Sequence, residues 1–188
     1  MTRDEIKYLA LQELGYTKQP DFDADDDNGV NAINGVYEHI FDLALTSFDW
    51  FFCDAFVEVD GDELENGRYK YEVELPDDVL FLRGVYADDT GTIIKDYYNA
   101  KDRLYLNKET VYLRYTKKVC EETLPPYFVE YLKYKLASKL CHSLTGDGDL
   151  LRLMMMREEE AFNLAKNADI CQRPVRYLDA NAFIEVRN

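Results

Sequence analysis

The spacing of apolar residues changes twice along this 188-residue chain, and this constrains the fold more than any other feature. Apolar residues recur every three to four positions up to about residue 52, every second position over 53–117, and every three to four positions again over 118–170. A period near 3.6 predicts amphipathic helices, and a period of two predicts half-buried strands. We therefore expect an α+β fold, in which a helical bundle of about four helices, residues 1–52 and 118–170, carries an inserted antiparallel β subdomain, residues 53–117.

Two helices are expected before the β segment. Thr2 can cap the first helix, and Glu5 three residues later completes a capping box. Gly15 suits the position just past its C-terminus. An apolar stripe predicts the second helix over about residues 31–51. An aromatic run follows it, and we expect this run to fill the core where helix meets sheet: Phe48, Trp50, Phe51 and Phe52.

Five or six strands are expected in the middle of the chain. The pattern predicts strands over 55–60, 69–75, 79–86, 104–106 and 111–115, and the last two are expected to pair as a hairpin around residues 107–109. Helical spacing returns after Pro125 and Pro126, which a first helical turn tolerates. Two helices, up to about residue 144 and over about 149–169, are joined by a turn at 145–148, so we expect them to lie antiparallel.

The last segment, residues 171–188, has no helical period, and we expect an extended C-terminal tail. It holds too many apolar side chains for a solvated tail, so we expect another surface to cover it. The residues assigned to this interface are Arg173, Arg176, Tyr177, Leu178, Phe183, Ile184 and Val186. In the preceding helix, Met154, Met155 and Met156 span all sides, so one of them is expected at the surface. Core filling is the default role of this run and a soft contact surface is the alternative.

The charge of the chain argues against two classes of partner. With 22 basic and 37 acidic side chains, the net charge is −15 and the pI is near 4.5. Such a chain repels phosphate at long range, which disfavours general binding to nucleic acid or anionic membranes. No apolar stretch approaches the 18 residues of a membrane span. Residues 1–16 are charged and amphipathic, so no signal peptide is expected there.

The aspartate-rich segment 19–29 does not have calcium-loop spacing. An EF-hand loop needs glycine at position 6 and glutamate at position 12. A start at Asp21 places Asp26 and Ala32 there, and a start at Asp23 places two asparagines there. We expect a solvated surface loop, with adventitious cation binding as the alternative.

The sequence also offers no nucleophile with a general base beside it. His142 follows Cys141 on a helix, where adjacent side chains point about 100° apart, so the two cannot form a dyad. His39 lies among apolar neighbours and is expected to be a partly buried structural histidine. The four cysteines form no CxxC pair, and we expect reduced, mostly buried thiols. No phosphate-binding glycine loop or GxSxG motif occurs. We therefore expect no enzyme activity, no catalytic residues, no cofactor and no metal.

The order of these segments resembles the head-to-tail adaptor family of short-tailed bacteriophages, often called tail tubular protein A. The resemblance rests on residues 6–15 (IKYLALQELG), 47–52 (SFDWFF), 75–85 (LPDDVLFLRGV), 113–117 (LRYTK) and 124–147, which begins LPPYF and ends LTGD. It covers about residues 3–170. Each motif is a packing signature, so the order and spacing carry the resemblance. The 19–29 loop is more acidic than the family pattern, and the tail after Asp169 cannot be aligned by motif.

The resemblance implies a structural virion protein, made in the bacterial host cytoplasm and located in the virion neck. Such adaptors form a ring, usually a dodecamer, below the portal protein, extend the DNA channel and seat the tail nozzle. The implied partners are the portal, the nozzle or next ring protein, and further copies of this chain. Double-stranded DNA would pass through without specific binding, because the charge of −15 per subunit would repel it. No membrane partner is implied, and the tail would dock on the portal or a neighbouring subunit.

Three alternatives remain open at this point. The first is a connector or head-completion protein of a long-tailed phage. The second is a non-viral regulatory or scaffolding interaction module. The third is a hydrolase that uses acidic residues of the β segment such as Glu58 and Asp60.

Overall fold

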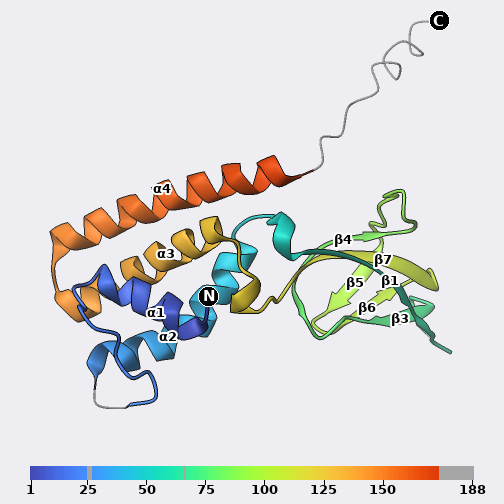
Figure 1. The fold of residues 1–188 in the computed structure, drawn as a ribbon. Coiled ribbons are helices and arrows are strands. Elements are labelled where there is room, and N and C mark those ends of the chain that lie inside the picture. The colour runs from blue at the N-terminus through green and yellow to red at the C-terminus, as the bar shows by residue number, and fades with distance from the viewer. Residues whose placement is uncertain (25–26, 66, 174–188) are drawn as a thin grey trace, which may run out of the picture.

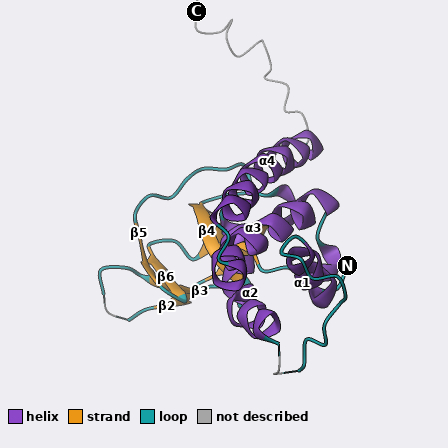
Figure 2. Cartoon of the chain, turned by 90° about the vertical axis from the view of Figure 1, so that its left-hand side faces the viewer, coloured by secondary structure: helices purple, strands orange, loops and turns teal. Residues whose placement is uncertain are grey.

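A computed structural model describes residues 1–24, 27–65 and 67–173. The fold is mixed α+β, as predicted, and the helices and strands gather at opposite ends of the molecule in Figure 1, so that Figure 2, seen from the helical end, shows the helices in front of the strands. The described helices are α1 (Arg3–Gln12), α2 (Asn28–Thr46), α3 (Pro126–Thr145) and α4 (Gly148–Gln172). The described strands are β1 (Asp54–Asp60), β2 (Asp62–Glu63), β3 (Tyr71–Glu74), β4 (Val79–Tyr86), β5 (Tyr97–Ala100), β6 (Arg103–Leu106) and β7 (Thr110–Lys117). Two short 3₁₀ helices, η1 (Phe51–Cys53) and η2 (Glu121–Thr123), flank the strands.

Side-chain caps set the starts of the first two helices. The predicted capping box of α1 is confirmed: the Thr2 hydroxyl accepts from the Glu5 amide at 3.3 Å, and the Glu5 carboxylate accepts from the Thr2 amide at 2.7 Å. α2 begins three residues earlier than expected, because the Asp27 carboxylate accepts hydrogen bonds from the amides of Gly29 and Val30. These bonds satisfy amides that have no partner within the helix.

The end of α2 differs from the prediction. The helix ends at Thr46 and not near Phe51, because the Ala44 carbonyl accepts from the Ser47 amide and from Trp50 Nε1, the latter at 2.9 Å. A continuing helix would use this carbonyl for its own ladder. Residues 51–53 instead form η1, which leads into the first strand.

The aromatic run fills the core only in part. Trp50 is 1% exposed, and its ring lies within 5.0–6.1 Å, centroid to centroid, of Phe48, Phe128, Tyr131 and Phe162. Phe51 is 44% exposed, so it does not belong to this cluster. The short 3₁₀ turn at 51–53 changes the direction of successive side chains and turns Phe51 outward.

α3 and α4 form the predicted antiparallel hairpin. Gly146 ends α3 with a φ of +66°, a left-handed conformation that suits glycine, and its amide donates to the His142 carbonyl. The Asp147 side chain then caps α4 by accepting from the amides of Asp149 and Leu150. α4 continues to Gln172, so residues 171 and 172 are helical and not part of an extended tail.

α3 is central among the helices. It packs against α1, α2 and α4, whereas α4 packs mainly on α3 and η1 (Figure 1). One side of α4 is therefore left without an intramolecular partner in the described part of the chain. None of the described helices is long and apolar enough to cross a bilayer.

The strands form two antiparallel sheets that share one core. One sheet has the order β1–β7–β4, and the other has the order β2–β3–β6–β5. Side chains of both sheets meet in a single apolar cluster, formed by Val73, Val85, Leu104, Leu106, Val111, Leu113 and Tyr115. The strands over 79–86 and near 55–60 were predicted at these positions, whereas β5 was not predicted.

The predicted hairpin of residues 104–106 with 111–115 is wrong. β6 and β7 lie in different sheets: β6 pairs with β3 and β5, and β7 pairs with β1 and β4. Both strands bury alternate apolar residues in the shared core, but they do so from opposite sides of it. The segment between them carries the chain from one sheet to the other. The tight hairpin is instead β5–β6, with Lys101 in the left-handed region at a φ of +53°.

Candidate functional site

The root of the C-terminal segment is anchored to the body of the protein. Arg173, the last described residue, lies 3.5 Å from the Asp169 carboxylate and 3.6 Å from the Asp49 carboxylate, nitrogen to oxygen. Its guanidinium also donates to the Asp49 carbonyl and lies 5.8 Å from the centre of the Phe48 ring. Arg173 was assigned to an interface with another chain, and the structure places its side chain against its own chain. The other six residues of that assignment lie outside the described residues.

Asp169 connects Arg173 to the neighbouring helices. Its side chain is fully buried, and its Oδ1 accepts hydrogen bonds from the Phe51 amide at 3.1 Å and the Tyr127 hydroxyl at 2.9 Å. Its Oδ2 accepts from the Phe51 amide at 2.9 Å and faces Arg173. Burial, together with the bond to this carboxylate, raises the pKa of Tyr127 well above its usual range. One carboxylate thus joins α3, α4, η1 and the start of the C-terminal segment.

Sequence reasoning did not identify Asp169. The available signal was an acidic residue four positions before an arginine at the end of a helix, a spacing that brings the two side chains together. The same buried position affects Cys53: burial, with Asp169 nearby, raises the pKa of this thiol to about 12.

A second group of charges joins the helices to the sheet. Arg114 on β7 donates to Asp54 at 3.0–3.2 Å and to Asp49 at 2.8 Å. The bond to Asp54 raises the Arg114 pKa above its ordinary value. Arg83 on β4 donates to the Phe48 carbonyl at 2.7 Å, and its Nε lies 3.9 Å from the Asp49 carboxylate. Asp49 therefore faces arginines from two strands and from the end of α4.

A cleft of about 730 Å³ is lined by Asp49, Asp54, Arg114 and Arg173, and its walls also include Phe56, Tyr86 and Asp89. Two of the carboxylates there, Asp49 and Asp54, are paired with Arg114, and Asp49 also lies 3.6 Å from Arg173. Charges paired in this way fix the relative position of two elements more than they favour a free ligand. We conclude that the cleft orients the sheet and the C-terminal root.

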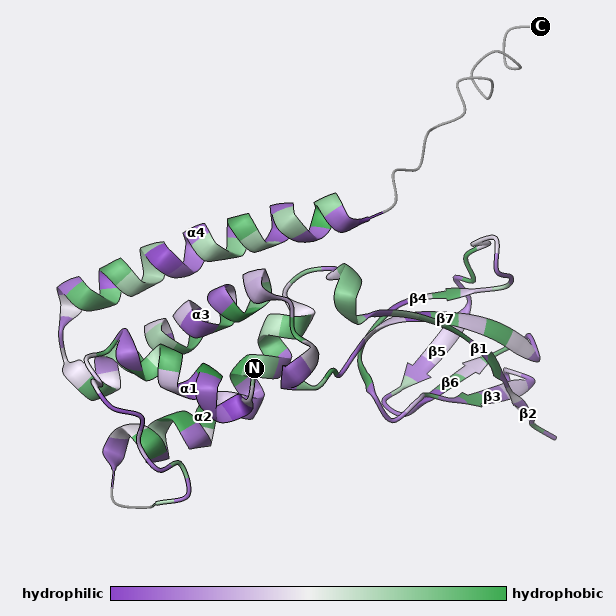
Figure 3. Cartoon of the chain, in the orientation of Figure 1, coloured by the Kyte–Doolittle hydropathy of each residue, from purple (hydrophilic) through white to green (hydrophobic). Residues whose placement is uncertain are grey.

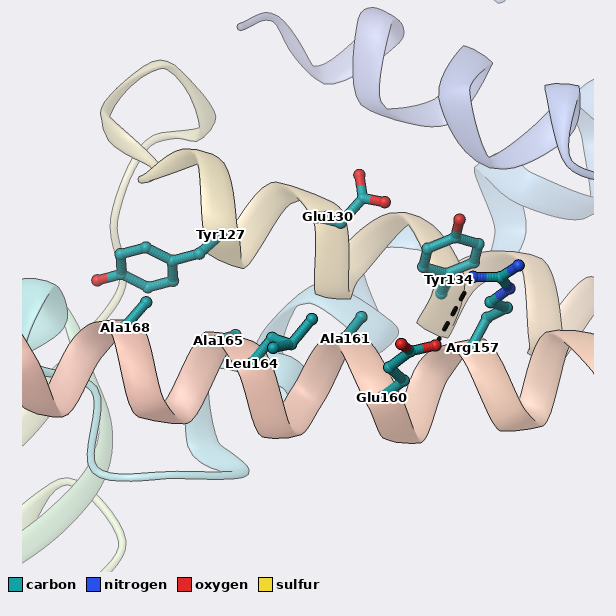
Figure 4. A pocket seen from close by; sticks show the side chains of 9 residues that line it. All are labelled: Tyr127, Glu130, Tyr134, Arg157, Glu160, Ala161, Leu164, Ala165 and Ala168. Carbon is teal, nitrogen blue, oxygen red and sulfur yellow. Dashed lines mark ion pairs between the residues drawn. The ribbon is translucent and has the colours of Figure 1, made fainter.

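A largely apolar groove lies between α3 and α4, with a volume of about 460 Å³ (Figure 4). Tyr127 and Tyr134 come from α3, and Leu164 stands on α4. Between these large side chains, α4 presents three alanines: Ala161, Ala165 and Ala168. An ion pair of Arg157 with Glu160 lies at one end, at 3.6 Å, and Tyr127 and Ala168 lie at the other, near Arg173.

Apolar side chains continue along α4 outside this groove, and Figure 3 shows hydrophobic residues over its whole length. The exposed large apolar residues of α4 are Leu153, Met155, Met156, Leu164 and Ile170. The methionine run behaves nearly as predicted: Met154 is buried, and two of its residues are exposed where one was expected. Several exposed apolar side chains on one helix are typical of a contact surface.

The remaining candidates from the sequence lie apart from these features. His39 is exposed, so the partly buried position predicted for it is wrong, because the apolar stripe of α2 turns the opposite face to the core. All four cysteines are free, but only Cys53 and Cys141 are buried, whereas Cys120 and Cys171 are exposed. Glu58 and Asp60 lie on β1, where Asp60 accepts from the Thr110 hydroxyl at 2.8 Å.

Within the described ranges, no group of three or more His, Cys, Asp or Glu side chains is placed to hold a metal ion. Comparison of the chain with protein-family models gives no match, and comparison with curated protein sequences gives none either. The functional argument therefore depends on the contacts and surfaces described above.

Proposed function

We propose that this protein is a structural virion component, a head-to-tail adaptor that forms a ring below the portal of a short-tailed phage, extends the DNA channel and seats the tail nozzle. The proposal includes the finer fold: a helical bundle with an inserted β subdomain, followed by an extended C-terminal tail. It includes no catalytic role.

The observation that carries the proposal is the number of large apolar side chains that α4 leaves exposed. Met155 is 57%, Met156 66% and Leu164 63% exposed. In a ring, each subunit offers one surface to the next and a different surface to the previous one, so the exposed apolar side chains of α4 gain a partner. This supports an assembly role more directly than it supports a solitary module.

Charge supports the same role. A conduit for packaged DNA must not grip phosphate, and a net charge of −15 per copy, repeated around a ring, repels it. The arginines at the junction of helices and sheet are paired with Asp49, Asp54 and Asp169, so they are not a free phosphate-binding patch.

The test is the mass of the complex formed when the protein meets the portal encoded in the same genome, measured by mass photometry with negative-stain images. We expect a gain of about twelve subunit masses, as in the family that the sequence resembles, and a lengthened ring. An intact portal ring without added mass would contradict the proposal.

A pair of matched variants makes the test specific to α4. Met156→Glu places a charge on the exposed face of α4, and Leu43→Glu places the same charge on α2, where Leu43 is 44% exposed. We expect Met156→Glu to abolish the mass that the protein adds to the portal ring, and Leu43→Glu to retain more of that mass. Equal binding by both variants would contradict a role for the α4 face.

A further inference from the structure

The groove between α3 and α4 is an unfilled apolar hollow in an otherwise close-packed hairpin. Its alanines are buried or half-buried, whereas Leu164 on its rim is 63% exposed. The groove of about 460 Å³ is open to solvent, and six of its nine lining residues are tyrosines, alanines and a leucine, beside Glu130, Arg157 and Glu160, so its mostly apolar floor favours an apolar occupant.

The groove opens beside the point where the described chain ends. Ala168, at one end of the groove, is only five residues before Arg173, and Tyr127 at the same end bonds to Asp169, which also faces Arg173. The chain continues for fifteen residues beyond Arg173. The next residue is Pro174, which cannot continue a helix ladder, so it suits a change of direction at this point.

The length of the following segment is sufficient to reach the groove. From Ala168 to Arg157 the groove follows α4 for about 16 Å, at 1.5 Å per residue. Residues 174–182 can span up to about 30 Å. They can therefore reverse direction and bring the apolar residues Phe183, Ile184 and Val186 over Leu164 and the alanines.

Charge decides between this segment and the same segment of a second copy. Residues 174–188 carry Arg176 and Arg187 against Asp179 and Glu185, so their net charge is zero, and the whole charge of −15 lies on residues 1–173. In free solution, where no portal holds the copies together, a second copy would bring its own charge of −15 toward the groove and would be repelled. A tethered neutral segment meets no such repulsion, and it acts at an effective concentration in the millimolar range.

We propose that, in the free protein, the C-terminal segment folds back on its own chain and seats residues 183–186 in the groove between α3 and α4. The proposal concerns the chain before assembly, so it does not depend on binding to a portal. It goes beyond the proposed function, because it gives the apolar end of the segment a place in the monomer.

Photo-crosslinking in the full chain tests the proposal. Benzoylphenylalanine is introduced in place of Leu164, which is exposed enough to accept it, and in a control chain in place of Leu153, which is 42% exposed on α4 but does not line the groove. Equal amounts of ¹⁴N-labelled and ¹⁵N-labelled protein are mixed, irradiated and digested with trypsin. Trypsin releases position 164 in residues 158–166, position 153 in residues 153–157, and the C-terminal partner in residues 177–187.

We expect crosslinks from position 164 to peptide 177–187 in which both peptides carry the same isotope, with a yield several-fold above that from position 153. Crosslinks with mixed isotopes would assign the groove to a second copy and overturn the proposal. A yield no higher than that from position 153 would also overturn it. Trp50 fluorescence of each chain checks that the core has formed, because Trp50 is buried there.

A variant without the probe provides an independent measurement. Phe183→Ser with Ile184→Ser, in the full chain, removes the proposed apolar contact without altering any described residue. We expect hydrogen exchange of the amides in residues 177–187 to become several-fold faster than in the unaltered chain. Equal exchange rates in the two chains would contradict the proposal.

Discussion

Removal of the Asp169 carboxylate tests how much its contacts with Phe51, Tyr127 and Arg173 stabilise the protein. In Asp169→Ala, the Phe51 amide and the Tyr127 hydroxyl lose their acceptor, and Arg173 keeps only its contacts with Asp49 and Phe48. A hydrogen bond to a charged group contributes about 1.5–3 kcal/mol. Tyr127 is half-buried, and Arg173 is 32% exposed, so water recovers part of the loss. We expect the free energy of unfolding to fall by about 2–4 kcal/mol.

Asp169→Asn separates the two oxygens. Oδ1, which accepts from both Phe51 and Tyr127, is retained, whereas Oδ2, which faces Arg173 and also accepts from the Phe51 amide at 2.9 Å, becomes an amide nitrogen, so the Phe51 amide keeps only its bond to Oδ1. We expect a loss of only about 1 kcal/mol. Arg152→Ala is the control, because Arg152 is 85% exposed and contacts only Asp149 in an exposed ion pair; its expected change is below about 0.5 kcal/mol.

The assay is urea and thermal unfolding followed by the fluorescence of Trp50, the sole tryptophan of the chain, which is 1% exposed. One kcal/mol shifts the melting temperature of a domain of this size by about 2–4 °C, so Asp169→Ala should melt roughly 4–16 °C lower. The reasoning fails if Asp169→Ala melts within 2 °C of the unaltered protein, or if the Ala and Asn variants are equally destabilised, because then the bonds to Oδ1 contribute nothing.

Three further predictions follow from the junction, the sheet core and the thiols. Arg114→Ala should lower the free energy of unfolding by about 1–3 kcal/mol, because it leaves Asp49 and Asp54 without their closest cation; urea unfolding that matches Arg152→Ala would contradict this. Burial, together with the hydrogen bond to Asp78, raises the pKa of Tyr115 to about 12. Between pH 10 and 12 the unfolded tyrosine loses its proton before the folded one, so the free energy of unfolding should fall as pH rises, and Tyr115→Phe should show a shallower fall. In the native protein at pH 8, Ellman's reagent should modify two thiols rapidly and all four in denaturant; rapid reaction of a third native thiol would refute the burial. The two expected to react are Cys120 and Cys171.

Local sequence patterns were sufficient for α1, α3 and α4, but not for the two ends of α2. The capping box of Thr2 with Glu5, the turn at Gly146 and the apolar spacing of α3 and α4 depend on residues within about four positions of one another, and the structure confirms each of them. Where a distant residue decided a boundary, the prediction was wrong. α2 stops at Thr46 because the indole of Trp50 returns to the Ala44 carbonyl.

Strand pairing and the hub at Asp169 depended on tertiary structure. The alternation in residues 104–106 and 111–115 predicted strands correctly, but it could not assign them to different sheets, because alternation gives the buried face of a strand and not its neighbour. β5 was missed because its two middle residues, Tyr98 and Asn99, are exposed, so it has no clear buried face.

The sequence by itself determined the α+β class, the order of helical and β segments, the antiparallel helical hairpin and the acidic charge of −15. Only the tertiary structure decided that Arg173 turns back to Asp49 and Asp169, that α4 leaves several apolar side chains and a groove uncovered, and that β6 and β7 lie in separate sheets. The physical reason is the separation along the sequence over which each kind of interaction acts. Periodicity and caps act between neighbours along the chain, whereas buried carboxylates, grooves and sheet order arise where segments far apart in sequence meet.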